Sequence, residues 1–326
     1  MIKLAVIGDP IEHSLSPKIH SYVMEQLGET YTYEAVRVAK GELAPFVERA
    51  RRGEVDGFNV TMPHKVDIIE FLDEIDRDAE YYNSVNTVKV DGGRLCGYNT
   101  DGGGFVRSLE GVGAVVSGAE ILFLGSGGVV NTLSQKLALE GARKIVVASR
   151  SNAVAVGVCE MLGEKFGRDK TPVNAGRLHE IKDFGNPQGR TVSKIKDFDG
   201  SAKNGVATLF AKEGFECEAV GFSDAVIGEK IRTADIVINA TPLGMKGFSA
   251  DWESCEFLRN AKPSALIADL NYNPRVPTLL KAANELGFRT LNGLGMLIYQ
   301  ALLADEIYLG RKFDDEEIVR GLQGLL

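Results

Sequence analysis

Two short segments of this chain place an amine and a carboxylate where proton-transfer chemistry is expected. Residues 57–65 read Gly-Phe-Asn-Val-Thr-Met-Pro-His-Lys and end on Lys65. Residues 97–101 read Gly-Tyr-Asn-Thr-Asp and end on Asp101. Both follow predicted strands, and a lysine and an aspartate that meet can pass a proton to or from an oxygen. The pattern indicates an acid–base pair.

Small hydrogen-bonding side chains accompany this pair. Any one of them is an ordinary polar residue at a strand end, but with Lys65 and Asp101 they form a set suited to a polyhydroxylated ring. The set consists of Asn59, Thr61, Asn86 and Thr100.

Ser14 and Ser16 follow the first predicted strand, 3–8, at the strand end where ligands of open α/β sheets bind. Ser16 is also expected to cap the helix that starts at Pro17. On the simpler interpretation, capping is the only role of these serines.

A glycine-rich turn at 125–128, Gly-Ser-Gly-Gly, follows a predicted strand at 120–124 and opens a helix. That context is typical of dinucleotide sites, because the backbone N–H groups and the helix N-terminus attract a pyrophosphate. Val130 stands where the motif has its third glycine. A tight turn without a ligand remains the alternative. A redox cofactor beside an acid–base pair suggests hydride transfer between an alcohol and a ketone.

Arg150 follows the next predicted strand, 144–149, at the place where NAD sites carry an acidic residue. An arginine there pairs with a 2′-phosphate, which favours NADP over NAD. The alternative is a solvent-exposed arginine without a ligand.

Composition sets the outer limits. The 326 residues are 44% hydrophobic and 25% charged, as in globular proteins, and the net charge of −8 argues against nucleic acid or an anionic membrane as partner. No apolar run reaches the ~18 residues of a membrane span. Four separated cysteines and four scattered histidines predict neither a disulfide framework nor a metal site, and fit a reducing cytoplasm.

Alternating strand and helix patterns predict an α/β fold with two α/β domains. The first domain is expected over 1–101, completed by C-terminal helices at 293–326. The second, over 102–292, is expected to be a Rossmann-type dinucleotide-binding domain with a surface insertion at about 167–216. Within it Ile-Lys-Asp-Phe occurs at 181–184 and again at 195–198.

Several motifs together resemble the shikimate dehydrogenase family, over nearly the whole chain outside the insertion. They are Gly-Asp-Pro-x-x-His-Ser-Leu-Ser-Pro at 8–17, Asn-Val-Thr-Met-Pro-His-Lys at 59–65, Val-Asn-Thr at 85–87, Asn-Thr-Asp-Gly at 99–102, Asn-Ala-Thr-Pro-Leu-Gly-Met at 239–245 and Gly-Leu-Gly-Met-Leu-x-x-Gln-Ala at 293–301.

The resemblance implies an NADP-dependent oxidoreductase of the cytoplasm, a monomer or homodimer, that reduces 3-dehydroshikimate to shikimate in chorismate and aromatic amino-acid biosynthesis. It implies Lys65 and Asp101 as the catalytic pair and no metal. Its substrate-binding residues would be Ser14, Ser16, Asn59, Thr61, Asn86 and Gln300. Its cofactor-binding residues would be Gly125, Ser126, Gly127, Gly128, Val129, Ser149, Arg150, Ser151, Asn239, Ala240, Thr241, Met245 and Gly293.

Two alternatives stay open. One is a quinate/shikimate dehydrogenase on the same fold, using NAD or NADP. The other is a ligand-sensing paralogue without catalysis, which has less need for both Lys65 and Asp101.

Overall fold

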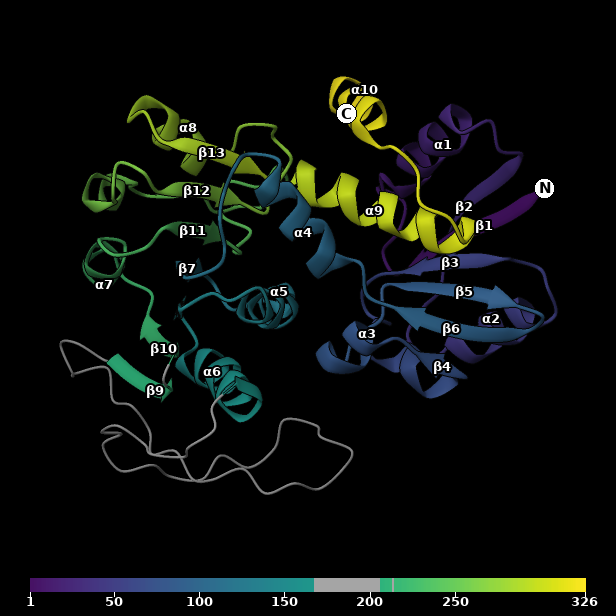
Figure 1. The fold of residues 1–326 in the computed structure, drawn as a ribbon, viewed down its shortest axis with the longest axis horizontal. Coiled ribbons are helices and arrows are strands. Elements are labelled where there is room, and N and C mark those ends of the chain that lie inside the picture. The colour runs from purple at the N-terminus through teal and green to yellow at the C-terminus, as the bar shows by residue number, and fades with distance from the viewer. Residues whose placement is uncertain (167–205, 213) are drawn as a thin grey trace. The chain divides into compact units, whose positions relative to one another are not determined.

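The computed structural model of the chain describes residues 1–166, 206–212 and 214–326, with the backbone alone for 206–212. These residues form two compact units (Figure 1). The first unit holds Met1–Ala114 and Leu291–Leu326, and the second holds Val115–Thr290. Each unit is built around its own β-sheet, which confirms the predicted class of two α/β domains.

The first sheet has six strands in the order β2-β1-β3-β5-β6-β4. Strand β1 is parallel to β2 and β3, whereas β5 runs antiparallel to both β3 and β6. Gly92 and Gly93, with φ of 56° and 84°, turn the β5–β6 hairpin. The strands are Ile2–Gly8 (β1), Tyr31–Arg37 (β2), Gly57–Val60 (β3), Glu74–Ile75 (β4), Thr87–Asp91 (β5) and Arg94–Tyr98 (β6).

Helices cover both faces of this sheet because successive residues of a strand point to opposite sides. Leu4 of β1 packs with Met24 and Ala304 from two helices, α1 and α9. Ala5 and Ile7 join the cluster that contains the apolar residues of α2. The helices are Ser16–Gln26 (α1), Leu43–Arg51 (α2), Arg77–Tyr82 (α3), Asp101–Glu110 (α4), Leu294–Leu309 (α9) and Glu316–Leu325 (α10), with a 3₁₀ turn at Asp67–Phe71 (η1).

Helix α4 belongs to the first unit, although the sequence analysis ended that domain at residue 101. The structure divides the units between Ala114 and Val115. The reason is that α4 packs along α9, and Figure 1 shows the two helices side by side. Gly104 permits this approach, since a Cβ there would lie 2.5 Å from the backbone nitrogen of Gln300.

The second sheet has seven strands in the order β13-β12-β11-β7-β8-β10-β9. Strands β12, β11, β7, β8 and β10 pair in parallel. Without β9, this is the strand order of a dinucleotide-binding fold. Its strands are Glu120–Leu124 (β7), Lys144–Ser149 (β8), Val206–Lys212 (β9), Phe215–Gly221 (β10), Ile236–Asn239 (β11), Leu266–Asp269 (β12) and Arg289–Asn292 (β13).

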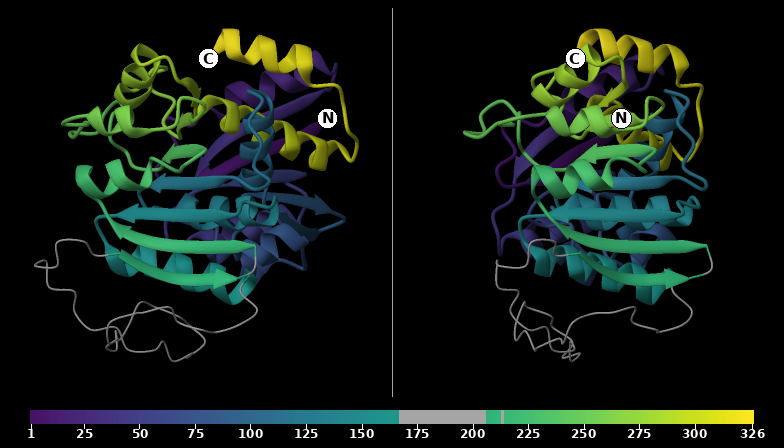
Figure 2. Two further views of the ribbon diagram at one scale, coloured as in Figure 1. Left: turned by 60° about the vertical axis from the view of Figure 1, so that its left-hand side comes forward. Right: turned by 90° about the vertical axis from the view of Figure 1, so that its left-hand side faces the viewer.

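The predicted insertion at 167–216 is wrong at its C-terminal end. Residues 206–212 form β9, which pairs antiparallel with β10 and extends the sheet by one edge strand (Figure 2). The physical reason is that the open edge of β10 presents unpaired N–H and C=O groups to a following or preceding strand. The repeated tetrapeptides at 181–184 and 195–198 lie outside the described residues.

The core of the second unit contains a disulfide that the sequence analysis did not expect. Cys159 of α6 and Cys217 of β10 are bonded, with Cα atoms 5.5 Å apart, and both side chains are fully buried. They meet because α6 packs against β10, although they are 58 residues apart in sequence. The helices of this unit are Gly128–Leu139 (α5), Asn152–Phe166 (α6), Asp224–Lys230 (α7) and Thr278–Glu285 (α8), with a 3₁₀ turn at Glu256–Asn260 (η2).

Candidate active site

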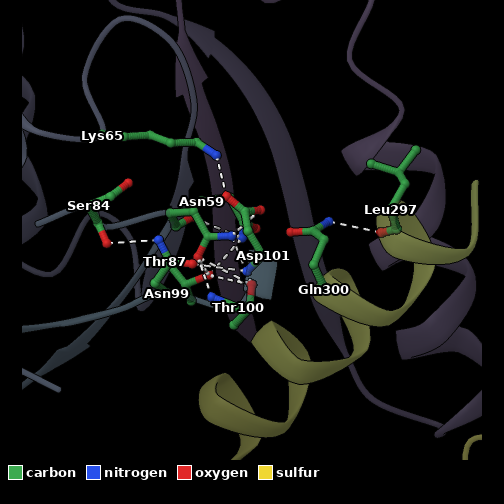
Figure 3. A network of polar contacts seen from close by, with 10 residues as sticks. Asn59, Lys65, Ser84, Thr87, Asn99, Thr100, Asp101, Leu297 and Gln300 are labelled. Atoms are coloured by element: carbon green, nitrogen blue, oxygen red, sulfur yellow. Dashed lines mark hydrogen bonds and ion pairs between the residues drawn. The ribbon is translucent and has the colours of Figure 1, made fainter. Parts of the chain in front are cut away.

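Lys65 and Asp101 meet in the first unit, 36 residues apart in sequence. The Lys65 Nζ atom lies 2.6 Å from Asp101 Oδ2 (Figure 3). Asp101 is the first residue of α4, where the partial positive charge of the helix N-terminus favours a carboxylate. The Lys65 side chain is 33% exposed and that of Asp101 12%. An amine in this position is paired with its carboxylate yet still reaches solvent.

The segment that carries Lys65 is fixed by contacts on both sides. Directly before it, the buried ring of His64 is hydrogen-bonded through Nε2 to the Val38 carbonyl oxygen at 2.7 Å. The carbonyl oxygen of Lys65 accepts from the Val85 N–H at 2.8 Å. Lys65 therefore extends from an anchored backbone.

Asp101 is held by two asparagines. Its Oδ1 atom accepts from Asn86 Nδ2 at 2.9 Å, and its N–H donates to Asn99 Oδ1 at 3.1 Å. Asn99 is anchored in turn by a 2.8 Å bond from its Nδ2 to the Ser84 carbonyl oxygen. The sequence analysis did not single out Asn99, although its position two residues before a helix-opening aspartate is a usable signal.

The side chain of Asn86 is fully engaged inside the protein. Its Nδ2 donates to Thr100 Oγ1 and to Asp101 Oδ1, both at 2.9 Å. Its Oδ1 accepts from the Thr100 N–H at 2.8 Å and from Thr87 Oγ1 at 3.0 Å. This residue orients the carboxylate of Asp101, and its predicted contact with substrate stays a prediction.

Asn59 and Thr61 lie at the end of β3, next to this network. Asn59 is 6% exposed, and its Nδ2 atom donates to Thr87 Oγ1 at 3.2 Å. Its Oδ1 accepts from the hydroxyl of Tyr33, a residue that the sequence analysis missed, at 2.6 Å. Thr61 is placed by a 2.9 Å bond from its N–H to the Ile7 carbonyl oxygen of β1.

The predicted capping role of Ser16 is wrong. Ser16 is the first helical residue of α1, Leu15 holds the cap position, and no side chain caps the helix there. Instead, Ser14 Oγ accepts from the Ser16 N–H at 3.2 Å. The hydroxyl of Ser16 is thereby left for other partners.

Gln300 reaches the network from α9. Its Nε2 donates to the Leu297 carbonyl oxygen at 2.9 Å, and Figure 3 shows the side chain extending from α9 towards Asp101. The close approach of α4 and α9 at Gly104 gives Gln300 this position. The structure thus gathers the predicted catalytic pair with Asn59, Asn86 and Gln300 in one unit.

The predicted cofactor residues of the second unit lie at the C-terminal ends of its strands. Gly125 has φ of +106°, and a Cβ there would lie 2.8 Å from the Thr241 side chain. The Ala240 N–H donates to the Leu124 carbonyl oxygen at 2.8 Å, which joins the 239–241 loop to this turn. Gly127 is the N-cap of α5, so the helix N-terminus opens directly at the turn.

The end of β8 is tied to the same turn through serines. Ser126 Oγ lies 2.6 Å from Ser149 Oγ, and Ser149 Oγ accepts from the Ser151 N–H at 3.1 Å. Arg150, which stands between Ser149 and Ser151 in the chain, is exposed. This exposure fits an arginine that binds an anionic ligand, and it equally fits a surface arginine that binds none. Val130, where the third glycine was expected, is fully buried in the core.

The loop after β11 has a polar support that the sequence analysis missed. Asn271 Nδ2 donates to the carbonyl oxygens of Thr241 and Leu243 at 3.0 and 3.1 Å, and its N–H donates to Asp269 Oδ1 at 2.9 Å. Asn239 Oδ1 accepts from the Thr241 N–H at 2.9 Å. Burial raises the pKa of Asp269 to about 6. Met245, at the end of the loop, is 40% exposed.

Gly293 differs from the other predicted cofactor residues. It is the N-cap of α9 and belongs to the first unit, whereas the others all lie in the second. Its predicted role stays a prediction.

Comparisons with known proteins identify the family. A family model described as the shikimate dehydrogenase substrate binding domain matches residues 6–88. A shikimate dehydrogenase (NADP(+)) of Methanococcus maripaludis is 34% identical over 312 residues, which cover 95% of this chain and 92% of that protein. The chain belongs to the shikimate dehydrogenase family.

Solved structures of this family share the fold. A shikimate dehydrogenase in complex with NADP⁺ is 31% identical, with a TM-score of 0.75 over 99% of this chain and 95% of its own. The Listeria monocytogenes shikimate 5-dehydrogenase, in complex with shikimate and NAD, is 28% identical, with a TM-score of 0.76 over 100% and 96%. A 5-ketofructose reductase of Gluconobacter is also similar, with a TM-score of 0.74 at 26% identity over 100% and 99%.

This fold therefore occurs in enzymes named for more than one carbonyl substrate, so the choice of substrate for this chain has to rest on its site residues.

Within the described ranges, no helix is long and apolar enough to cross a membrane. In that same part of the chain, no group of three or more His, Cys, Asp or Glu side chains is arranged to hold a metal ion.

Proposed function

We propose that this chain is an NADP-dependent shikimate dehydrogenase that reversibly reduces 3-dehydroshikimate to shikimate, a step of chorismate and aromatic amino-acid biosynthesis. The observation that carries the proposal is the 2.6 Å pair of Lys65 Nζ and Asp101 Oδ2. It lies in the unit whose sequence matches the shikimate dehydrogenase substrate binding domain. A cytoplasmic location and a monomeric or homodimeric state stay predictions.

Lys65 would manage the proton of the reaction. When NADPH is bound, its nicotinamide supplies the hydride for the carbonyl carbon. The Lys65 ammonium would donate a proton to the oxygen that becomes the hydroxyl group, and a neutral Lys65 would accept that proton in the reverse direction. Asp101 accepts from Lys65 Nζ and so keeps the amine directed, while Asn86 keeps the carboxylate itself in place.

Substrate would be held by neutral polar groups of the same unit. The Ser14 and Ser16 hydroxyls are the candidates for the ring carboxylate, since Ser16 is not used as a helix cap. Asn59, Thr61 and Gln300 are the candidates for the ring hydroxyls. This division matches a substrate that carries one carboxylate and several hydroxyl groups.

The second unit fits a dinucleotide. Gly127 is the N-cap of α5, so the N–H groups of the first turn of this helix are available to a pyrophosphate. Ser149, Arg150 and Ser151 at the end of β8 would meet the adenosine ribose, with Arg150 on a 2′-phosphate. No acidic residue occupies these three positions, which favours NADP over NAD.

Two alternatives have less support. A quinate/shikimate dehydrogenase that uses NAD would need the same Lys65–Asp101 pair, and a neighbour of the same fold was solved with NAD. A ligand-sensing paralogue would have no need to hold Lys65 and Asp101 at 2.6 Å.

The test is a steady-state assay of the purified chain with shikimate or quinate, each with NADP⁺ and with NAD⁺. The proposal expects nicotinamide reduction with shikimate and NADP⁺, with kcat/KM at least about tenfold above the other three combinations, equal to ~1.4 kcal/mol. Turnover that is faster with quinate, or absent with all four, would overturn it.

A further inference from the structure

Behind the polar network of the first unit lies a buried cluster that the proposed mechanism does not use. His20 of α1 and Asp305 of α9 are both 0% exposed, and His20 Nδ1 lies 2.6 Å from Asp305 Oδ1. Tyr308, one turn further along α9, is 8% exposed and its ring centroid lies 6.3 Å from that of His20.

The ring of Tyr33 rests on this cluster. It is stacked on His20 with centroids 4.4 Å apart and planes inclined by 9°. Because His20 is fixed by Asp305, and both are enclosed, the Tyr33 ring has a rigid support on that face. Burying a histidine and an aspartate costs desolvation free energy that a pair of apolar side chains would not cost. The presence of this pair therefore points to a role beyond packing.

The Tyr33 hydroxyl contacts one of the predicted substrate-binding residues. It donates to Asn59 Oδ1 at 2.6 Å. Removal of this hydroxyl from water, together with the nearby Asp305 carboxylate, raises the pKa of Tyr33 well above its usual value. The hydroxyl therefore keeps its proton and remains a donor to Asn59.

The groups on both sides of Asn59 set which way its carboxamide points, because the Asn86 carbonyl oxygen can only accept and the Tyr33 hydroxyl donates from the other side. With Oδ1 turned to Tyr33, the Nδ2 atom donates to Thr87 Oγ1 at 3.2 Å and lies 3.4 Å from the Asn86 carbonyl oxygen. Both Nδ2 hydrogens are used in this arrangement, whereas Oδ1 can accept a second hydrogen bond. Asn59 then offers a substrate an acceptor and no donor.

We propose that Tyr33 is a positioning residue, which fixes the Asn59 carboxamide so that its Oδ1 accepts a hydrogen bond from a ring hydroxyl of the substrate, with the His20–Asp305 pair holding the Tyr33 ring. This inference rests on the proposed function, because the hydroxyl is taken to be that of shikimate. In this proposal Tyr33 orients a substrate-binding side chain, Asn59, without itself contacting the substrate.

Tyr33→Phe tests the inference, since it removes the hydroxyl and keeps the ring that stacks on His20. We expect KM for shikimate to rise about fivefold, which is ~1 kcal/mol and within the range for one neutral hydrogen bond. We expect kcat and KM for NADP⁺ to stay within about twofold, because the acid–base pair and the cofactor unit are untouched.

Tyr308→Phe is the matched control. It removes a second tyrosine hydroxyl beside the same His20, and this hydroxyl is buried without a hydrogen-bond partner among the described residues. It should leave KM for shikimate unchanged and leave the melting temperature unchanged or higher. A merely structural role of the cluster would make the two variants alike.

A double-mutant cycle with Asn59→Ala locates the effect. If Tyr33 acts through Asn59, Tyr33→Phe should lower kcat/KM for shikimate about fivefold in the wild type and less than about twofold in the Asn59→Ala background. Equal losses in both backgrounds, or an unchanged KM in a folded Tyr33→Phe enzyme, would overturn the inference and leave the proposed function standing. A wild-type protein without shikimate turnover would overturn both.

Discussion

In the first unit the predicted catalytic groups are side chains held by other side chains, whereas in the second unit the predicted phosphate-binding groups belong to the backbone. Asp101 has its carboxylate and its N–H bound by Asn86 and Asn99. Gly125, in contrast, is defined by φ of +106° and by the space that its missing side chain leaves for Thr241. The proposed reaction would therefore depend on the positions of side chains in the first unit and on the conformation of the backbone in the second.

This difference predicts different consequences of mutation. In the first unit, shortening one side chain removes a chemical group and should act on turnover. In the second unit, adding one methyl group fills space and should act on cofactor binding or on folding. The predictions below are ordered by the size of the expected effect.

Lys65→Ala should lower kcat by about 10²–10⁴-fold, the usual contribution of a general acid–base group, and leave KM for shikimate within a few-fold. The measurement is kcat and KM with NADP⁺ at saturation. Lys18→Ala is the control, because Lys18 lies in the same unit and its Nζ donates to the exposed Leu325 carbonyl oxygen at 3.0 Å. Near-normal turnover of Lys65→Ala would remove Lys65 from the chemistry.

Arg150→Ala should raise KM for NADP⁺ by about tenfold or more and barely change KM for NAD⁺, since a charge-assisted contact contributes ~1.5–3 kcal/mol. Arg143→Ala is the control, because Arg143 precedes β8 at its other end and pairs with Glu120. The measurement is the ratio of kcat/KM for the two cofactors. Equal losses for both would contradict a 2′-phosphate contact.

Gly125→Ala should lower the melting temperature, because its φ of +106° is unfavourable for alanine by at least ~1–2 kcal/mol and its Cβ would meet Thr241. Gly127→Ala should fold almost normally, since Gly127 has φ of −63° and a Cβ there would lie 3.6 Å from the Ala240 carbonyl oxygen. Its KM for NADP⁺ should nevertheless rise if a pyrophosphate approaches that backbone. An unchanged KM would contradict the proposed phosphate site.

Asp269→Asn should raise the melting temperature at pH 7.5. Burial raises the pKa of Asp269 from 3.8 to about 6, so the folded state binds a proton more tightly than the unfolded state. Above pH 6 the charged carboxylate therefore destabilises the fold by on the order of 3 kcal/mol, and this cost disappears as the pH falls through about 6 towards 4. The advantage of the variant should shrink over the same interval.

Asp235→Asn should change the stability of the protein in the opposite direction to Asp269→Asn. Burial opposes the ionisation of Asp235, but hydrogen bonds from the Glu120 N–H and from Lys262 leave its pKa lowered. This substitution should destabilise the protein at pH 7.5, and its effect should be lost as the pH falls below the usual pKa of an aspartate. Melting curves for both variants, from pH 8 down to a pH below the usual pKa of an aspartate, check the assignment.

Much of the fold could be predicted from local pattern. The strands predicted at 120–124 and 144–149 match the structure residue for residue, because a short apolar run that ends at a turn is a local property. The Lys65–Asp101 pair was predicted for a related reason, since both residues follow strands whose ends meet in one sheet.

What the sequence could not show depends on contacts between distant segments. Tyr33 looks like an ordinary strand residue until His20 and Asp305, 285 residues apart, are brought beneath its ring. The Cys159–Cys217 bond depends in the same way on the packing of α6 against β10. Ser16 was misread because a serine before a proline satisfies the local capping pattern, whereas the helix starts one residue earlier than that pattern requires.

The central claim is that Lys65 and Asp101 act as one proton-transfer unit, and a double-mutant cycle on kcat tests it most directly. The four enzymes are the wild type, Lys65→Ala, Asp101→Asn and the double variant, each assayed with shikimate and NADP⁺. Residues that act as a unit give strongly non-additive losses. We predict that the double variant loses no more than about threefold beyond Lys65→Ala, a difference of ~0.7 kcal/mol. A loss equal to the product of the two single losses would contradict the claim.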